Sequence, residues 1–138
     1  MPHVTAQTIA ERIEALYGQP LAELTARAQA NPDGSMLAAL LATHADMEWA
    51  EQHIEFQLQR LRQLAAPEQV IGPFEASHLL DCARRVAESV AVRDAHTKSM
   101  TAVLQSLHRV PAPQAPSPAP PPPAAPAPGA AASTTPTR

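Results

Sequence analysis

Apolar side chains recur every three or four residues through the first 110 positions, which is the spacing of one face of an α-helix. Sustained alternation of apolar and polar residues is absent, and β-branched residues are few beside alanine and leucine. The pattern predicts an all-α fold. Helices are expected over about residues 8–17, 20–30, 35–65 and 74–109, with breaks at glycine and proline between them.

The two long predicted helices carry matching heptad stripes. Because their connection is short, we expect an antiparallel, coiled-coil-like hairpin in which facing residue numbers sum to 144. The two short N-terminal helices then brace this hairpin in a three- or four-helix bundle. The facing pairs are Leu37–Leu107, Leu40–Leu104, His44–Met100, Met47–Thr97, Glu51–Arg93, Ile54–Val90, Leu58–Val86, Leu61–Ala83 and Ala65–Leu79.

Glu51 and Arg93 are the only acidic and basic residues of this stripe, and they face each other in that register. A slip by one heptad in either direction would leave both charges without a partner, which is costly in a buried setting. We therefore expect Glu51 and Arg93 to form a buried ion pair that sets the register of the hairpin.

Trp49 and Phe56 lie seven residues apart on the opposite side of the first long helix, with His53 between them. Two interpretations follow. The short helices need an apolar surface to bury against, which favours core packing of these aromatic rings. Alternatively, Trp49, His53 and Phe56 form an exposed surface that binds a protein partner, since aromatic residues dominate binding hot spots. A second copy of the hairpin would also complete a four-helix bundle as a homodimer.

The chain changes character at residue 111, which divides a helical domain (1–110) from a tail (111–138). Proline and alanine fill 20 of the 28 tail positions, and Arg138 is its only charged residue. Such a segment buries too little apolar surface to fold, so we expect disorder with polyproline II character. The tail is either a spacer or a proline-rich ligand, and the absence of basic residues beside Pro120 favours a spacer.

Composition narrows the class of protein further. The chain has 138 residues, a net charge of −3 and one cysteine, which fits a single domain and excludes an intramolecular disulfide framework. No apolar run is long enough to span a membrane, and the N-terminus lacks a secretory signal pattern, so a cytoplasmic location is expected. Nine arginines against one lysine, with abundant alanine, indicate a GC-rich coding sequence and a bacterial source.

Catalytic and metal-binding patterns are sparse. His78, Asp81 and Cys82 lie within one helical turn and form a weak candidate metal site that lacks a fourth ligand. Cys82 has His78 one turn earlier as a candidate base but lacks an orienting third group and an oxyanion donor, so no catalytic residue or cofactor is expected. The sequence predicts a non-enzymatic protein-interaction or scaffolding protein. The alternatives are a small DNA-associated regulator using the N-terminal helices, which the acidic balance disfavours, and a metal-dependent activity near His78.

Overall fold

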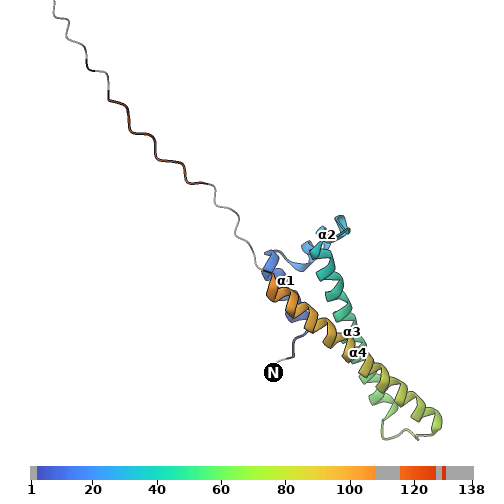
Figure 1. The fold of residues 1–138 in the computed structure, drawn as a ribbon. Coiled ribbons are helices and arrows are strands. Elements are labelled where there is room, and N and C mark those ends of the chain that lie inside the picture. The colour runs from blue at the N-terminus through green and yellow to red at the C-terminus, as the bar shows by residue number, and fades with distance from the viewer. Residues whose placement is uncertain (1–2, 108–115, 127–128, 130–138) are drawn as a thin grey trace, which may run out of the picture.

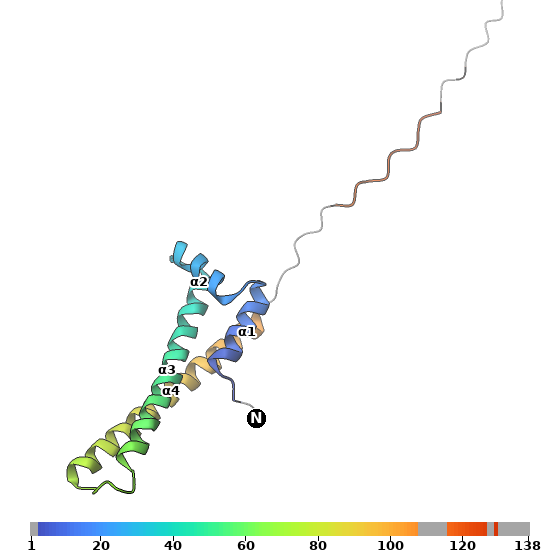
Figure 2. The ribbon, with the colours of Figure 1, turned by 180° about the vertical axis from the view of Figure 1, so that it is seen from behind.

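The computed structural model describes residues 3–107, 116–126 and 129, and the described part contains four helices and no strand (Figure 1). The all-α prediction is confirmed. The two long helices pack closely, and α4 returns alongside α3 after the connection at the hairpin tip, as both ribbon views show (Figure 2). The helices are α1 (Ala6–Tyr17), α2 (Leu21–Ala30), α3 (Met36–Leu64) and α4 (Pro73–Ser106).

The first helix begins two residues earlier than expected. Its N-cap is Thr5, whose side-chain hydroxyl accepts a hydrogen bond from the backbone N–H of Thr8 at 3.3 Å. The helix ends at Gly18, as predicted. This glycine has a left-handed backbone with φ of 68°, and its N–H donates to the Glu14 carbonyl at 2.7 Å.

The other helix starts agree with the sequence signals. Pro20 precedes α2, and the Ser35 hydroxyl accepts from the Ala38 N–H at 3.3 Å to cap α3. At the start of α4 the Glu75 carboxylate folds back and accepts from the Gly72 N–H at 3.0 Å. The predicted end of this helix near residue 109 lies outside the described residues, and its described part ends at Ser106.

The core lies at the end of the hairpin where α1 and α2 pack. Ile9, Ile13, Leu24 and Met47 are the largest fully buried side chains, and they come from α1, α2 and α3. Helix α1 contacts both long helices, whereas α2 packs mainly on the N-terminal part of α3. The hairpin tip, formed by the second half of α3 and the first half of α4, has no third helix against it in Figures 1 and 2.

The predicted register is confirmed at one layer near the core. The Thr97 hydroxyl donates to the Arg93 carbonyl at 2.9 Å, and its oxygen lies 3.8 Å from the Met47 sulfur; the numbers 47 and 97 sum to 144. Leu40, Met100 and Leu104, also members of the predicted stripe, are buried in the same core cluster.

Toward the tip the buried stripe departs from the prediction. Gln57 is only 4% exposed, whereas its expected neighbour Leu58 is 36% exposed. On α4 the buried residue is Cys82, and Ala83 is exposed. A strict heptad assumes helices that stay aligned with their seam. On each long helix the buried position toward the tip therefore lies one residue before the position that the strict heptad gives.

Residues 116–126 of the proline-rich tail have neither helix nor strand, and every one of them is exposed. The expected domain boundary at residues 110 and 111 lies outside the described part of the chain. None of the helices in that part combines the length and the hydrophobicity that crossing a membrane requires.

Candidate interaction surface

Trp49 and Phe56 lie on the outward side of α3, with 62% and 54% of their surfaces exposed. The interpretation that the short helices cover them is therefore wrong. Helix α1 buries its apolar residues against both α3 and α4, and α2 packs on the N-terminal part of α3, so neither helix covers Trp49 or Phe56. A seven-residue spacing places two side chains on one helix face, but it does not reveal which face the neighbouring helices choose.

His53 connects the aromatic residues to the helix pair. Its ring lies 4.9 Å from the Trp49 ring, centroid to centroid, with the two planes tilted by 38°. Its Nε2 atom is 3.2 Å from the side-chain nitrogen of Gln57, which is buried between the long helices. Contacts on both sides hold the imidazole in place, so Trp49 and His53 present one continuous surface.

Two hollows run beside these residues along the boundary between α3 and α4. The first, of about 430 Å³, is lined by Trp49 and His53 and by Arg84, Arg85, Glu88, Ser89 and Val92. The second, of about 280 Å³, is lined by Phe56, Gln57 and Arg60 and by His78, Asp81, Cys82 and Arg85. The three predicted partner-binding residues therefore border a shallow groove with an apolar α3 side and a charged α4 side. We call this surface, with its two hollows, the aromatic face.

The charged side of the aromatic face is an ordered network. Asp81 accepts from Arg84 at 2.7 Å and from Arg85 at 2.9 Å, and Arg84 also donates to Glu88 at 2.6 Å. The hydrogen bond from Arg84, followed by that from Arg85, holds the pKa of Asp81 below its ordinary value. The same bond to Asp81 raises the pKa of Arg84. The network stays charged at neutral pH and marks one edge of the groove.

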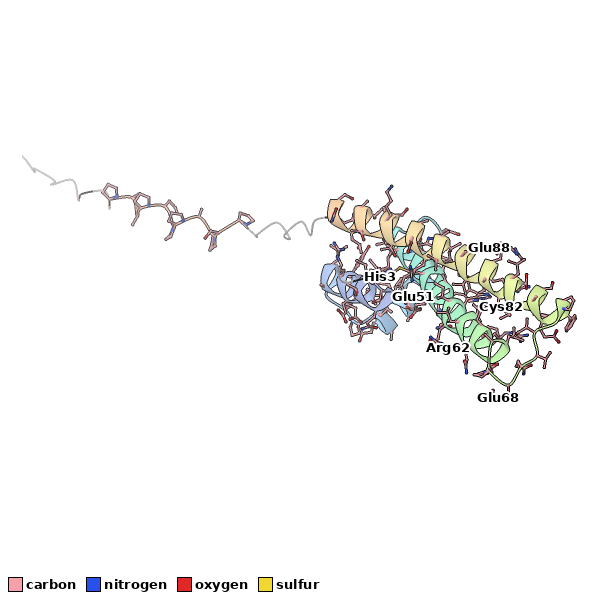
Figure 3. All side chains as sticks on the ribbon, turned by 90° about the horizontal axis from the view of Figure 1, so that it is seen from below. His3, Glu51, Arg62, Glu68, Cys82 and Glu88 are labelled. Atoms are coloured by element: carbon pink, nitrogen blue, oxygen red, sulfur yellow. The ribbon has the colours of Figure 1, made fainter. Side chains whose placement is uncertain are left out.

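Glu51 and Arg93 each bind a group other than their expected partner. The Glu51 carboxylate accepts from the backbone N–H of Ala6 at 2.9 Å, and Figure 3 shows Glu51 beside α1. Arg93 donates to Asp94 at 2.8 and 2.9 Å. Within the described residues, no ion pair of 4.0 Å or less joins Glu51 to Arg93. The free N–H groups and the partial positive charge at the start of a helix explain why α1 attracts this carboxylate.

The backbone of Ala6 is held by a second polar residue of α3. His44, which is 3% exposed, places its Nε2 atom 3.0 Å from the Ala6 carbonyl oxygen, so this nitrogen carries the proton and donates. His44 and Glu51 are seven residues apart, and together they bind both polar backbone groups of Ala6. The two polar residues that α3 contributes to the predicted stripe thus fasten α1 to the hairpin.

The candidate metal ligands are not brought together as a site. Asp81 is engaged by two arginines, His78 packs edge-on against Phe74 with ring centres 4.5 Å apart, and Cys82 is buried. Across the described ranges, no three His, Cys, Asp or Glu side chains are grouped so as to hold a metal ion. The geometry gives no support to a metal-dependent activity near His78.

In the helix pair considered for DNA binding, one of the two arginines is engaged by neighbouring side chains. Arg27, one of its two basic residues, donates to the Gln19 side chain at 3.0 Å. Its guanidinium also lies 5.6 Å from the centre of the Tyr17 ring. These contacts occupy one of the few cations that the pair offers to a phosphate backbone.

A further hollow, which sequence reasoning missed, lies between α2 and the start of α3. It has a volume of about 850 Å³, and its lining is dominated by small and apolar side chains. Its signal in the sequence is the set of alanines in the same stripe as Trp49. The lining residues are Thr25, Ala28, Gln29, Pro32, Gly34, Ser35, Met36, Ala38, Ala39, Leu41 and Ala42. We call it the alanine hollow.

Comparisons with protein-family models, with curated proteins and with solved structures found no match. Function therefore has to be argued from the chemistry of the described surfaces. Among these surfaces, the aromatic face brings two exposed aromatic residues of one helix together beside two hollows.

Proposed function

We propose that this chain is a non-enzymatic protein-interaction or scaffolding protein, and that its partner binds the aromatic face formed by Trp49, His53 and Phe56. The observation that carries the proposal is the exposure of two large aromatic residues on one side of a 29-residue helix. Tryptophan supplies more binding energy per residue than most side chains when a partner covers it. The proposal assigns no catalytic residue and no cofactor.

The surroundings of the aromatic face support binding of a protein. Interfaces combine an apolar centre with a polar rim. Here Trp49 and Phe56 form the apolar part, and Arg84, Arg85 and Glu88 form the rim. The Arg–Asp–Glu network fixes the positions of these charges before binding, so a partner meets a surface that is already ordered.

The hairpin supplies the rigid support that such a surface needs. Trp49 and Phe56 project from α3, which is held by α4 along its length and by α1 through His44 and Glu51. We interpret the α3–α4 pair as an antiparallel, coiled-coil-like platform, and the proline-rich tail as a spacer beside it. A binding residue on a braced helix loses little conformational freedom when its partner arrives.

The proposal is tested by capturing partners of the tagged full chain from its native cells, with and without Trp49→Ala. Leu80→Ala is the matched control, because Leu80 is a 73% exposed residue of α4 that lines neither hollow of the aromatic face. Both substitutions are on the surface, so circular dichroism should show unchanged helix content. We expect Trp49→Ala alone to lose the captured proteins by at least tenfold. Equal capture by both variants would contradict the proposal.

A further inference from the structure

The aromatic face belongs to a longer stripe along α3, which is exposed at Trp49 and Phe56 and reaches α2 at its N-terminal end. Seven residues recur at alternating steps of four and three, which is the spacing of a helix-packing seam. None of them is buried in the structure. The N-terminal half of the stripe holds only alanine, and the C-terminal half holds large side chains. The stripe consists of Ala38, Ala42, Ala45, Trp49, Gln52, Phe56 and Gln59.

The alanine hollow lies at the small-residue end of the same stripe. Ala38 and Ala42 belong to both, and Ala28 of α2 forms part of the opposite wall. The helix surface thus has a depression at one end and projecting aromatic rings toward the other. Phe56 and Ala38 are 18 residues apart, which is about 27 Å along a helix.

We propose that a second copy of this chain binds the stripe, with the two α3 helices antiparallel, so that Phe56 of each copy enters the alanine hollow of the other. The inference rests on the proposed function, because it assigns an occupant to the aromatic face. In this register, the numbers of two residues that face each other across the dimer, one from each copy, sum to 94. Trp49 then meets Ala45, Gln52 meets Ala42, and Phe56 meets Ala38.

The pattern of sizes favours this occupant over an unrelated helix. In an antiparallel pair related by a twofold axis, each copy supplies both the projection and the depression. Every aromatic residue of the stripe then faces an alanine, and no large side chain faces another. Alanine at the contact lets two helices approach to about 8 Å, the short end of the usual range. An unrelated partner would use the projections without requiring a matching depression on the same stripe.

The charges near the twofold axis predict how the salt concentration affects this dimer. The twofold axis passes near residue 47, and the exposed acidic residues Asp46 and Glu48 flank it. Each therefore lies close to acidic groups of the second copy. Screening by salt weakens this repulsion, so self-association should tighten as the salt concentration rises. A basic partner on the same surface would bind more weakly under those conditions.

The first test is sedimentation equilibrium of the full chain carrying Phe56→Ala, Ala38→Phe or both. Each single change should raise the dissociation constant of the dimer at least tenfold. Phe56→Ala removes the side chain that enters the alanine hollow, and Ala38→Phe fills that hollow. The double variant exchanges the two residues and should restore the dissociation constant to within about threefold of wild type. Because the two positions are about 27 Å apart within one chain, rescue requires contact between chains. A wild-type chain that stays monomeric at every salt concentration would overturn the inference.

The second test does not depend on the folding of Ala38→Phe. Spin labels at Gln52 and Gln59, in a Cys82→Ser background, report the distance between equivalent positions of the two copies. The antiparallel register predicts offsets along the helix of about 15 Å at position 52 and about 36 Å at position 59. Equal distances at the two positions would indicate a parallel pair and overturn the proposed arrangement.

The outcomes also separate this inference from the proposed function. A monomeric chain whose partner capture is abolished by Trp49→Ala contradicts the dimer and leaves the interaction surface supported. A monomeric chain whose capture is unaffected by that substitution contradicts both. A dimer that is lost in Phe56→Ala and restored in the double variant supports both.

Discussion

Replacing Glu51 tests how α1 is attached to the hairpin. Glu51→Ala removes the carboxylate that accepts the Ala6 N–H at 2.9 Å in a partly buried position. Loss of a helix cap costs about 0.5–2 kcal/mol, and loss of a hydrogen bond to a charged group about 1.5–3 kcal/mol. Since the hydrogen bond is only partly buried, we expect Glu51→Ala to lower the free energy of unfolding by about 1.5 kcal/mol. For a domain of this size, that corresponds to a fall of about 6–12 °C in the melting temperature.

Urea unfolding followed by circular dichroism measures the loss. Glu51→Gln keeps the acceptor oxygen and removes the charge, so it should cost roughly half as much. Glu55→Ala is the control on the same helix, because Glu55 is exposed, and its effect should stay within about 0.5 kcal/mol. In Glu51→Ala, hydrogen exchange should accelerate more at the Ala6 amide than at the other amides of α1, because only the Ala6 N–H loses its acceptor.

A double-mutant cycle between Glu51→Ala and Arg93→Ala separates the attachment of α1 from a direct ion pair. The two side chains bind Ala6 and Asp94, respectively, so their effects on unfolding should add to within about 0.5 kcal/mol. A coupling energy above about 1 kcal/mol would refute the present reasoning and restore the expected register-setting pair.

Three further predictions concern the core, a cap and the charged network. Ile13→Ala should lower the free energy of unfolding by about 2–5 kcal/mol, whereas Val92→Ala, at 43% exposure, should cost far less in the same urea titration. Gly18→Ala places a Cβ on a backbone with φ of 68° and should cost about 1–2 kcal/mol, with unchanged stability contradicting the cap. The carboxyl of Asp81 should titrate below its ordinary pKa of 3.8 by NMR, and Arg84→Met should raise its midpoint. Since the folded pKa is lowered, this contribution is present above pH 3.8 and is lost as the pH falls through the folded value; a midpoint at 3.8 or above would contradict it.

Local signals were sufficient to predict the helices. Gly18, the segment around Pro32 and Gly72–Pro73 interrupt the pattern at the places where the chain turns, and helix spacing needs only near neighbours. The register of Met47 opposite Thr97 was also predictable, because the connection between the long helices is short.

The environment of the polar stripe residues was not predictable in the same way. A stripe pairs α3 with α4 and contains no information on where α1 docks. The N-terminus of α1 competes for Glu51, and Arg93 finds Asp94 beside it. Toward the tip the buried positions are Gln57 and Cys82, each one residue before the position that strict heptad counting gives.

Whether Trp49 and Phe56 are exposed could not be predicted for the same reason, because the sequence pattern does not show where α1 and α2 dock. Trp49 and Phe56 have a spacing that suits both a core and an interface, and only the placement of α1 and α2 decides between them. Their seven-residue spacing therefore indicated a surface without indicating its environment.

The thinness of the hairpin tip has a consequence for the order in which the molecule opens. Ile9, Ile13, Leu24 and Met47 are fully buried at the braced end, whereas the buried residues nearer the tip include Gln57, Cys82 and Ser89, which are polar or small. Local opening requires less free energy where less apolar surface is covered. Native-state hydrogen exchange should therefore be fastest in the last turns of α3 and the first turns of α4.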